Sequence, residues 1–132
     1  MGVKLAIDRN KRLVVSTYYG EIKDSDVLAQ AALIGSHPDF DPSFSEIADF
    51  SEVSSGTVST VAIREMARRP SIYDPASMHV AIAPQPHIFG LARMFQAFAD
   101  QTRANVAVVR TMNEAHKILG LEKTDSAKTK KR

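Results

Sequence analysis

A short, mostly apolar run from Met78 to Ala83 constrains the fold of this chain more than any other stretch. It stops at Pro84-Gln85-Pro86, and a longer segment with helix-spaced apolar residues follows from Ile88 to Arg103. A run of this length bounded by proline is typical of a buried strand, and the segment after it is typical of a helix packed on a sheet. Because the chain offers two further strand-to-helix units, the sequence predicts an α/β fold with a mostly parallel sheet.

The first twenty residues predict an antiparallel hairpin. Val3, Leu5 and Ile7 alternate with Lys4 and Ala6, and in the run from Leu13 to Tyr19 the odd-numbered residues alternate with Val14, Ser16 and Tyr18. Asp8-Arg9-Asn10-Lys11 lies between the two runs and is rich in turn-forming residues. Two runs of period two about such a turn are typical of paired antiparallel strands. We therefore expect the first strand to run against the rest of the sheet.

The remainder of the chain alternates helices and strands. Helices are predicted at residues 24–35, 58–69, 88–103 and 111–120, and strands at 45–50, 78–83 and 105–110. Asp24 or Ser25 would cap the first of these helices, and Thr111 with Glu114 forms a capping box for the last. Together with the hairpin, this predicts the order ββαβαβαβα: a mixed, mostly parallel five-stranded sheet with about four helices, in one domain over residues 1–121.

Several expectations concern individual side chains. The inner face of the helix at 58–69 is predicted to hold Val58, Val61, Ala62 and Met66. On the central strand, the small side chains of Ala81 and Ala83 would let a helix approach closely, and His79 would lie half exposed in a structural role. Asp49 falls near the end of its strand, on the rim where parallel sheets place ligands; alternatively, it accepts backbone N–H groups of the following loop.

The composition restricts the function classes. The chain has no cysteine, which excludes disulfides, thiolate metal sites and a cysteine nucleophile. Its amino terminus shows neither a signal peptide nor a membrane span, so we expect a cytoplasmic protein. Residues 122–132 carry a net charge of +3, which leaves −1 of the chain's +2 for residues 1–121. We interpret 122–132 as a disordered basic tail, and because it lacks aromatic residues we do not expect nucleic-acid binding.

Two short motifs resemble those of a known family. Gly20-Glu21-Ile22 after the second strand and Asp49-Phe50-Ser51-Glu52-Val53 in and after the third resemble the signatures of STAS domains, such as the bacterial anti-sigma-factor antagonists. Within that family, the chain is most similar to a SpoIIAA-like branch of small bacterial proteins. The likeness includes the Asp39–Pro42 loop, the Phe89–Met94 segment and the stretch from Asn113 to Gly120. It implies the same fold across residues 3–121.

The resemblance also implies a phosphorylation site. In the antagonists, a serine or threonine at the start of the helix after the Asp-Leu-Ser-x-Val motif accepts phosphate from a kinase that is also the binding partner. The corresponding string here is Thr57-Val58-Ser59-Thr60, which lacks the family's acidic residue and glycine. Thr57 and Ser59 are the candidate phospho-acceptors, because a helix N-terminus favours a bound phosphate.

The leading functional hypothesis is a non-catalytic regulatory module that binds another protein. Its surface would combine the edge at residues 54–60 with the helix that carries Phe89 and Met94, two apolar residues outside that helix's apolar stripe. The residues predicted to form this partner or ligand surface are Asp49, Ser55, Arg64, Phe89, Arg93 and Met94.

The alternative hypothesis is a carrier or sensor of a small apolar or anionic, lipid-like ligand. Its pocket would be lined by Phe40, Phe44, Phe89 and Met94, with Arg64 or Arg93 for an acidic head group.

Catalysis is the least favoured interpretation. The chain has no G-x-S-x-G elbow, no helix with two histidines at metal-ligand spacing and no Gly-rich phosphate loop. We therefore predict no catalytic residue, no metal and no cofactor. An exposed hairpin edge and stray apolar residues on a helix favour a homodimer.

Overall fold

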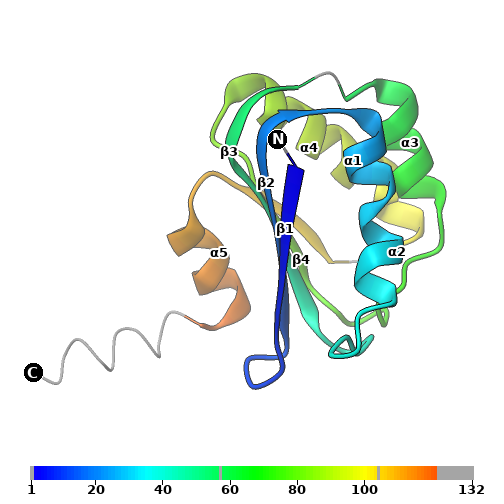
Figure 1. The fold of residues 1–132 in the computed structure, drawn as a ribbon, viewed down its shortest axis with the longest axis vertical. Coiled ribbons are helices and arrows are strands. Elements are labelled where there is room, and N and C mark those ends of the chain that lie inside the picture. The colour runs from blue at the N-terminus through cyan, green and yellow to red at the C-terminus, as the bar shows by residue number, and fades with distance from the viewer. Residues whose placement is uncertain (1, 57, 104, 122–132) are drawn as a thin grey trace, which may run out of the picture.

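The computed structural model describes residues 2–56, 58–103 and 105–121, and it contains a five-stranded mixed sheet with helices on both faces (Figure 1). The strands are β1 (Gly2–Asp8), β2 (Leu13–Ile22), β3 (Ser45–Gly56), β4 (His79–Ile82) and β5 (Val106–Val109). The helices are α1 (Asp24–Leu28), α2 (Gln30–Gly35), α3 (Thr60–Arg68), α4 (Pro86–Phe98), the short 3-10 helix η1 (Ala99–Gln101) and α5 (Met112–Leu119). The predicted α/β fold and its order of elements are confirmed, with the first helix divided in two.

The strands lie side by side in the order β1-β2-β3-β4-β5. β1 is antiparallel to β2, and every other neighbouring pair is parallel. Parallel neighbours require crossover connections, which are right-handed in nearly all proteins. Because successive crossovers here move in the same direction along the sheet, their helices fall on the same face. Figure 1 shows α1 to α4 on this face, which we call the helix face, and α5 on the opposite one, the α5 face.

The α5 face is filled by branched aliphatic side chains. Leu13, Ile47, Val80 and Ile82 project from β2, β3 and β4, and all are at least 94% buried. Ala115 of α5 is fully buried against them. The alternation of strand residues thus gives this side of the sheet a continuous apolar layer.

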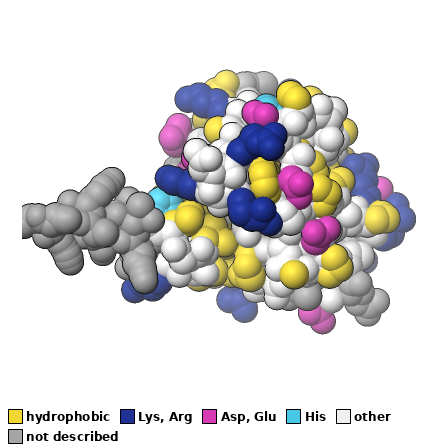
Figure 2. Space-filling model, turned by 90° about the horizontal axis from the view of Figure 1, so that it is seen from below, with side chains coloured by type: hydrophobic (Ala, Val, Ile, Leu, Met, Phe, Trp, Pro, Cys, Tyr) yellow, Lys and Arg dark blue, Asp and Glu magenta, His cyan; other side chains and the backbone are white. Residues whose placement is uncertain are grey.

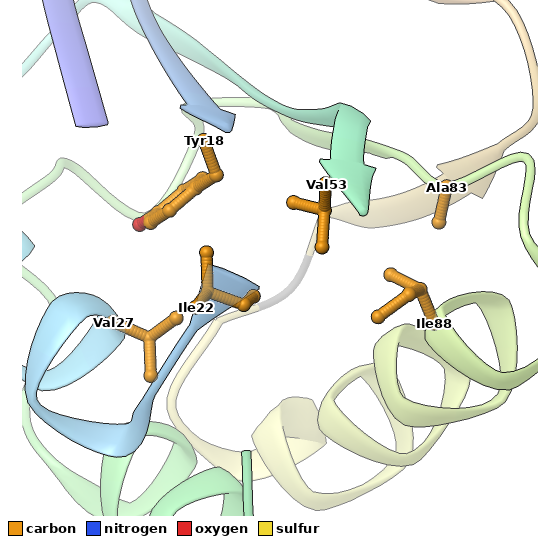
Figure 3. Close-up of a cluster of buried hydrophobic side chains, with 6 residues drawn as sticks. All are labelled: Tyr18, Ile22, Val27, Val53, Ala83 and Ile88. Atoms are coloured by element: carbon orange, nitrogen blue, oxygen red, sulfur yellow. The ribbon is translucent and has the colours of Figure 1, made fainter. Parts of the chain in front are cut away.

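The helix face has two separate apolar clusters. The first joins the carboxyl-terminal halves of β2 and β3 to α1 and α4; Figure 3 shows its members, Tyr18, Ile22, Val27, Val53, Ala83 and Ile88. The second lies nearer the other end of the strands and consists of Val14, Ile34, Phe44 and Tyr73. The space between the two clusters is where the candidate site lies.

The prediction of one helix over residues 24–35 was wrong in two respects. The helix is broken at Ala29, and α2 begins at Gln30, whose side chain turns inward to donate a hydrogen bond to Ser16. The residue that caps α1 is Lys23, whose backbone N–H donates to the Asp26 carboxylate at 2.8 Å. Asp24 does not cap its own helix, because its carboxylate accepts two hydrogen bonds from Ser59.

The third strand and the helix after it also differ from the prediction. β3 continues to Gly56, because β2 extends to Ile22 and pairs with it through two register shifts. α3 therefore starts later than expected, with Ser59 as its N-cap. Val61, expected inside, is 76% exposed, and the buried residues of α3 are Ala62, Ile63 and Ala67.

The closing helix agrees with the sequence. Thr111 and Glu114 form the predicted capping box, with the Glu114 backbone N–H donating to Thr111 Oγ1 at 3.1 Å and the Thr111 N–H donating to the Glu114 carboxylate at the same distance. Gly120 ends α5 with φ of 74°, a conformation that favours glycine. Within the described part of the chain, the helices lack the length and apolar character needed to cross a membrane.

Candidate functional site

A row of small side chains crosses the middle of the helix face. Ser16 of β2 lies opposite Ala48 of β3, and Ala48 lies opposite Ala81 of β4. Residues in register on neighbouring strands point to the same face of the sheet, so these three side chains form one shallow strip. The helices do not pack closely against Ala48 and Ala81 of this strip, and a cavity of about 580 Å³ lies between the sheet and α1 to α4.

This cavity changes one expectation from the sequence. Small residues on β4 were predicted to let a helix approach closely, and Ala83 does so, because it is buried against Ile88 of α4. Ala81, two residues earlier on the same face, lines the cavity instead. The larger side chains of the two flanking clusters, Tyr18 on one side and Tyr73 on the other, also line it.

The walls of the cavity are predominantly apolar and include aromatic rings. Tyr18 and Phe50 stack on each other with ring centroids 4.6 Å apart and nearly parallel planes. α3 contributes Ile63 and Met66, and α4 contributes apolar residues along the stripe that the sequence predicted, Ile88, Leu91, Ala92 and Phe95. A pocket of this size with apolar walls and a few polar groups is typical of small-molecule sites.

The polar groups gather at the end of the cavity where β4 begins. Glu46 and His79 lie opposite each other on β3 and β4, and His79 Nδ1 is 2.8 Å from Glu46 Oε1. The Tyr73 and His79 rings form a T-shaped pair with a centroid distance of 4.8 Å. His79, expected to be half exposed, is only 7% exposed because Tyr73 and Glu46 cover it.

Gln30 and Arg103 add further polar groups to the lining of the cavity. Gln30 Nε2 donates a hydrogen bond of 2.9 Å to Ser16 Oγ, and both residues are buried. Arg103 follows η1; its Nη1 donates to Thr102 Oγ1 at 3.0 Å, and its guanidinium lies 5.3 Å from the centroid of the Phe95 ring. Arg103 thus brings a positive charge to a cavity in which Glu46 supplies the negative one.

The cavity shifts the protonation equilibria of its ionisable groups. Burial raises the pKa of the Tyr73 hydroxyl well above its ordinary value of 10, and the nearby Glu46 carboxylate raises it further. Burial and Glu46 raise the pKa of Tyr18 in the same way. Burial also lowers the pKa of Arg103, while Glu46 acts in the opposite direction. Both tyrosines therefore stay protonated at physiological pH.

The entrance to the cavity lies between α2 and the segment after α3. The exposed residues that line it are Ala31, Ala32 and Gly35 on one side and Arg69 and Pro70 on the other. Arg69 ties the two sides together: its Nη1 donates to the backbone oxygen of Leu28 at 3.1 Å, and its Nε donates to Glu65 at the same distance. A ligand that enters here must pass this side chain.

The residues predicted for a ligand pocket lie elsewhere. Phe89 packs against the first cluster of the helix face, with the Arg110 guanidinium 3.9 Å from its ring centroid. Met94 is half-buried and Arg93 exposed on α4, and neither lines the cavity. Phe40 and Phe44 contribute to the second cluster, where Phe40 meets the edge of Tyr73.

Arg64, Asp49 and Ser55, which were predicted for the partner or ligand surface, are also separated from the cavity. Arg64 lies on the outer side of α3, with its guanidinium 4.8 Å from the Phe98 ring centroid. Asp49 lies within β3, 8% exposed, where its Oδ1 accepts hydrogen bonds from the backbone N–H and hydroxyl of Ser51. Ser55 is exposed opposite Glu21 of β2. The structure does not bring these residues into one site.

Of the two candidate phospho-acceptors, Thr57 lies outside the described residues. Ser59 is half-buried; its hydroxyl donates to Asp24 Oδ2 at 2.8 Å and accepts from the Ala62 N–H at 3.1 Å. A phosphate on Ser59 would place its negative charge beside the Asp24 carboxylate, and like charges at this distance repel. The contact with Asp24 therefore opposes phosphorylation of the folded chain at Ser59.

The cavity residues that sequence reasoning missed are Glu46, Tyr73 and Arg103. One signal for Glu46 was present in the sequence. It is a carboxylate at the second position of a strand whose other residues are mostly apolar, and because neighbouring residues point to opposite faces, it lies on the face opposite Ile47. Alignment of the central strands by their first residues would have placed it beside His79. No comparable signal marks Tyr73 and Arg103, because both come from segments between regular elements.

The surface outside the cavity carries mixed charges. On the face shown in Figure 2, basic and acidic side chains are interspersed with apolar ones, and neither sign of charge dominates.

Comparison of the sequence with known proteins gives no assignment: no protein-family model matches the chain, and no curated protein matches it.

Proposed function

We propose that this protein is a binding module that encloses a small, mostly apolar ligand in the cavity of its helix face. The observation that supports this most directly is the cavity itself, about 580 Å³ with aromatic and aliphatic walls and a polar end. Pockets for drug-sized ligands commonly measure about 300–1,000 Å³. At the polar end, His79 pairs with Glu46 and Arg103 brings a positive charge, and these side chains line the cavity where the head group of a ligand would lie.

The proposal includes kinship with STAS-like proteins of the SpoIIAA-like branch and a non-catalytic, regulatory role. The five-stranded mixed sheet with an antiparallel first strand is compatible with that family. A bound ligand would contact both sides of the entrance, α2 and residues 69–72, and would hold them in one arrangement. A partner protein that contacts these segments would then distinguish the loaded chain from the empty one.

The first test looks for a bound ligand and then fills part of the cavity with a larger side chain. Native mass spectrometry after gentle purification is expected to show a mass above that of the bare chain. The uncharged fluorophore N-phenyl-naphthylamine is expected to gain fluorescence when it binds in the cavity. The variant Ala81→Leu is expected to weaken this binding by at least about tenfold, which is equivalent to about 1.4 kcal/mol.

Ala97→Leu is the matched control for this experiment, because Ala97 is exposed on α4 and does not line the cavity. It makes the same chemical change on the same domain and is expected to leave probe binding unaltered. The proposed function would be contradicted if mass spectrometry showed only the mass of the chain without a ligand and the chain also failed to bind the fluorophore.

A second candidate function, docking of another protein, is favoured by one surface. Val61 is 76% exposed on α3, and it lies one turn before Arg64, whose guanidinium covers the 37% exposed Phe98 of α4. Side chains at the outer edge of two adjacent helices suit a partner helix or a second copy of the chain. Affinity purification from native cells with the original chain and with Val61→Asp tests this. A partner lost only with Val61→Asp would support it, and identical results would contradict it.

A further inference from the structure

The polar end of the cavity contains a donor that the protein itself does not use. Tyr73 is only 9% exposed, and its hydroxyl has no partner among the described residues at ordinary hydrogen-bond distance and angle; the nearby Glu46 carboxylate acts on it without forming a well-aligned bond. Buried hydroxyl groups without a partner are rare, because the loss of their hydrogen bonds to water is not compensated. The ring is held in place by edge contacts with Phe40 and His79, so the hydroxyl cannot turn away to water without breaking them.

The charges around this hydroxyl nearly cancel. The negative charge of Glu46 acts on Tyr18, Tyr73 and Arg103 alike. Arg103 supplies the opposing positive charge, and His79 already occupies one oxygen of the carboxylate. A carboxylate head group would lie against Glu46, and an ammonium head group would lie against Arg103. Either would place a like charge beside a charge that is already partly buried, which is costly.

We propose that the cavity selects amphiphiles whose head group is an uncharged oxygen, a hydroxyl or a carbonyl, over the corresponding carboxylates and amines. In this complex, the Tyr73 hydroxyl donates a hydrogen bond to the ligand oxygen, and the alkyl portion lies between the stacked pair Tyr18 and Phe50 and the apolar residues of α4. This inference rests on the proposed function and narrows it, because the sequence alone left an anionic ligand open.

The experiment compares three ligands of equal chain length. Dodecanol, dodecanoate and dodecylamine are titrated at neutral pH against the chain loaded with N-phenyl-naphthylamine, and the displacement constants are compared. Dodecanol is expected to bind at least about tenfold more tightly than the other two. Equal or tighter binding of dodecanoate or dodecylamine would overturn the head-group inference and leave the proposed function standing. Failure of all three ligands and of the fluorophore to bind would overturn both.

Two variants test the named atoms. Tyr73→Phe is expected to weaken dodecanol binding about three- to tenfold more than it weakens binding of the fluorophore, which has no oxygen to accept the hydrogen bond. Glu46→Gln removes the repelling charge and is expected to raise the affinity ratio of dodecanoate to dodecanol by at least about threefold. Unchanged ratios in both variants would overturn the assignment.

Tyr19→Phe serves as the matched control, since Tyr19 lies on β2 outside the cavity. Circular dichroism and thermal unfolding of each variant show whether the fold is retained. A Tyr73→Phe effect that Tyr19→Phe reproduced would be a general consequence of losing a phenolic hydroxyl and would overturn the role of Tyr73.

Discussion

The two faces of the sheet are built from alternate residues of the same strands, yet one is filled and the other is hollow. On the α5 face, Ile47, Val80 and Ile82 are at least 99% buried in an aliphatic layer. On the helix face, their neighbours Ala48 and Ala81 are small and line the cavity. A difference of two or three carbon atoms per side chain, repeated across neighbouring strands, separates a packed layer from a cavity. The following predictions test whether this difference has the expected energetic consequences.

The largest effect is expected from Ile47→Ala on the filled face. Removal of a fully buried isoleucine from a packed layer leaves a void and costs about 2–5 kcal/mol of unfolding free energy. Urea denaturation followed by circular dichroism measures this loss. A cost below about 1 kcal/mol would mean that the α5 face is as loosely filled as the helix face, and the contrast between the two faces would be lost.

The same substitution on opposite faces is expected to give opposite results. Ala115→Leu forces a larger side chain into the filled face, where Ala115 is fully buried, and should cost about 1–3 kcal/mol. Ala81→Leu adds the same atoms to the cavity and should leave the unfolding free energy unchanged or slightly raised. Paired denaturation curves measure both. Equal destabilisation by the two variants would show that the helix face closes up in solution.

The buried tyrosines of the hollow face predict a loss of stability at high pH. The pKa values of Tyr18 and Tyr73 in the folded chain lie above the ordinary value of 10. Above pH 10 the unfolded chain therefore releases protons that the folded chain retains, and the free energy of unfolding falls. Below pH 10 both states hold these protons, and this loss of stability is absent. Thermal unfolding at several pH values is expected to show a declining midpoint above pH 10. Tyr73→Phe should reduce this decline, whereas Tyr19→Phe should not reduce it to the same extent.

The smallest effect on stability is expected at the entrance. Arg69→Ala removes an exposed ion pair with Glu65 and a hydrogen bond to the backbone oxygen of Leu28, and exposed pairs of this kind contribute little to the unfolding free energy. Stopped-flow measurement of fluorophore binding should nevertheless show faster association and faster dissociation, with little change in the equilibrium constant. Unaltered rates would place the route of entry elsewhere, and the two sides of the entrance would then have no gating role.

Much of the fold was accessible from the sequence, because the signals that specify it are local. The alternation around Asp8–Lys11 predicts the hairpin, and Thr111 with Glu114 marks the start of α5. The errors occur where a distant residue overrides a local preference. Asp24 has the chemistry of a helix cap, but its carboxylate accepts hydrogen bonds from Ser59, thirty-five residues away. The end of β3 could not be predicted from its own residues, because the length of β2 determines it.

The site was much less accessible than the fold. A cavity arises where side chains are too small to fill the space between a sheet and its helices. A sequence shows the small residues, but it does not show whether a helix packs against them. Ala81 and Ala83 illustrate this limit: they are the same residue on the same face, and only Ala83 is covered by α4. The search for exposed apolar residues drew attention to Phe89 and Met94, whereas the residues that define the cavity are buried and unexceptional in type.

The order of the strands has a consequence for where any ligand can bind. Many doubly wound α/β proteins bind ligands in a crevice that opens where two adjacent crossovers leave the sheet in opposite directions, a topological switch point. The order β1-β2-β3-β4-β5 contains no such reversal among the described strands, so the usual opening beyond the strand tips is missing there. A ligand of the proposed kind would instead lie between the sheet and α1 to α4, and it would reach this space from the side of the layer, between α2 and residues 69–70.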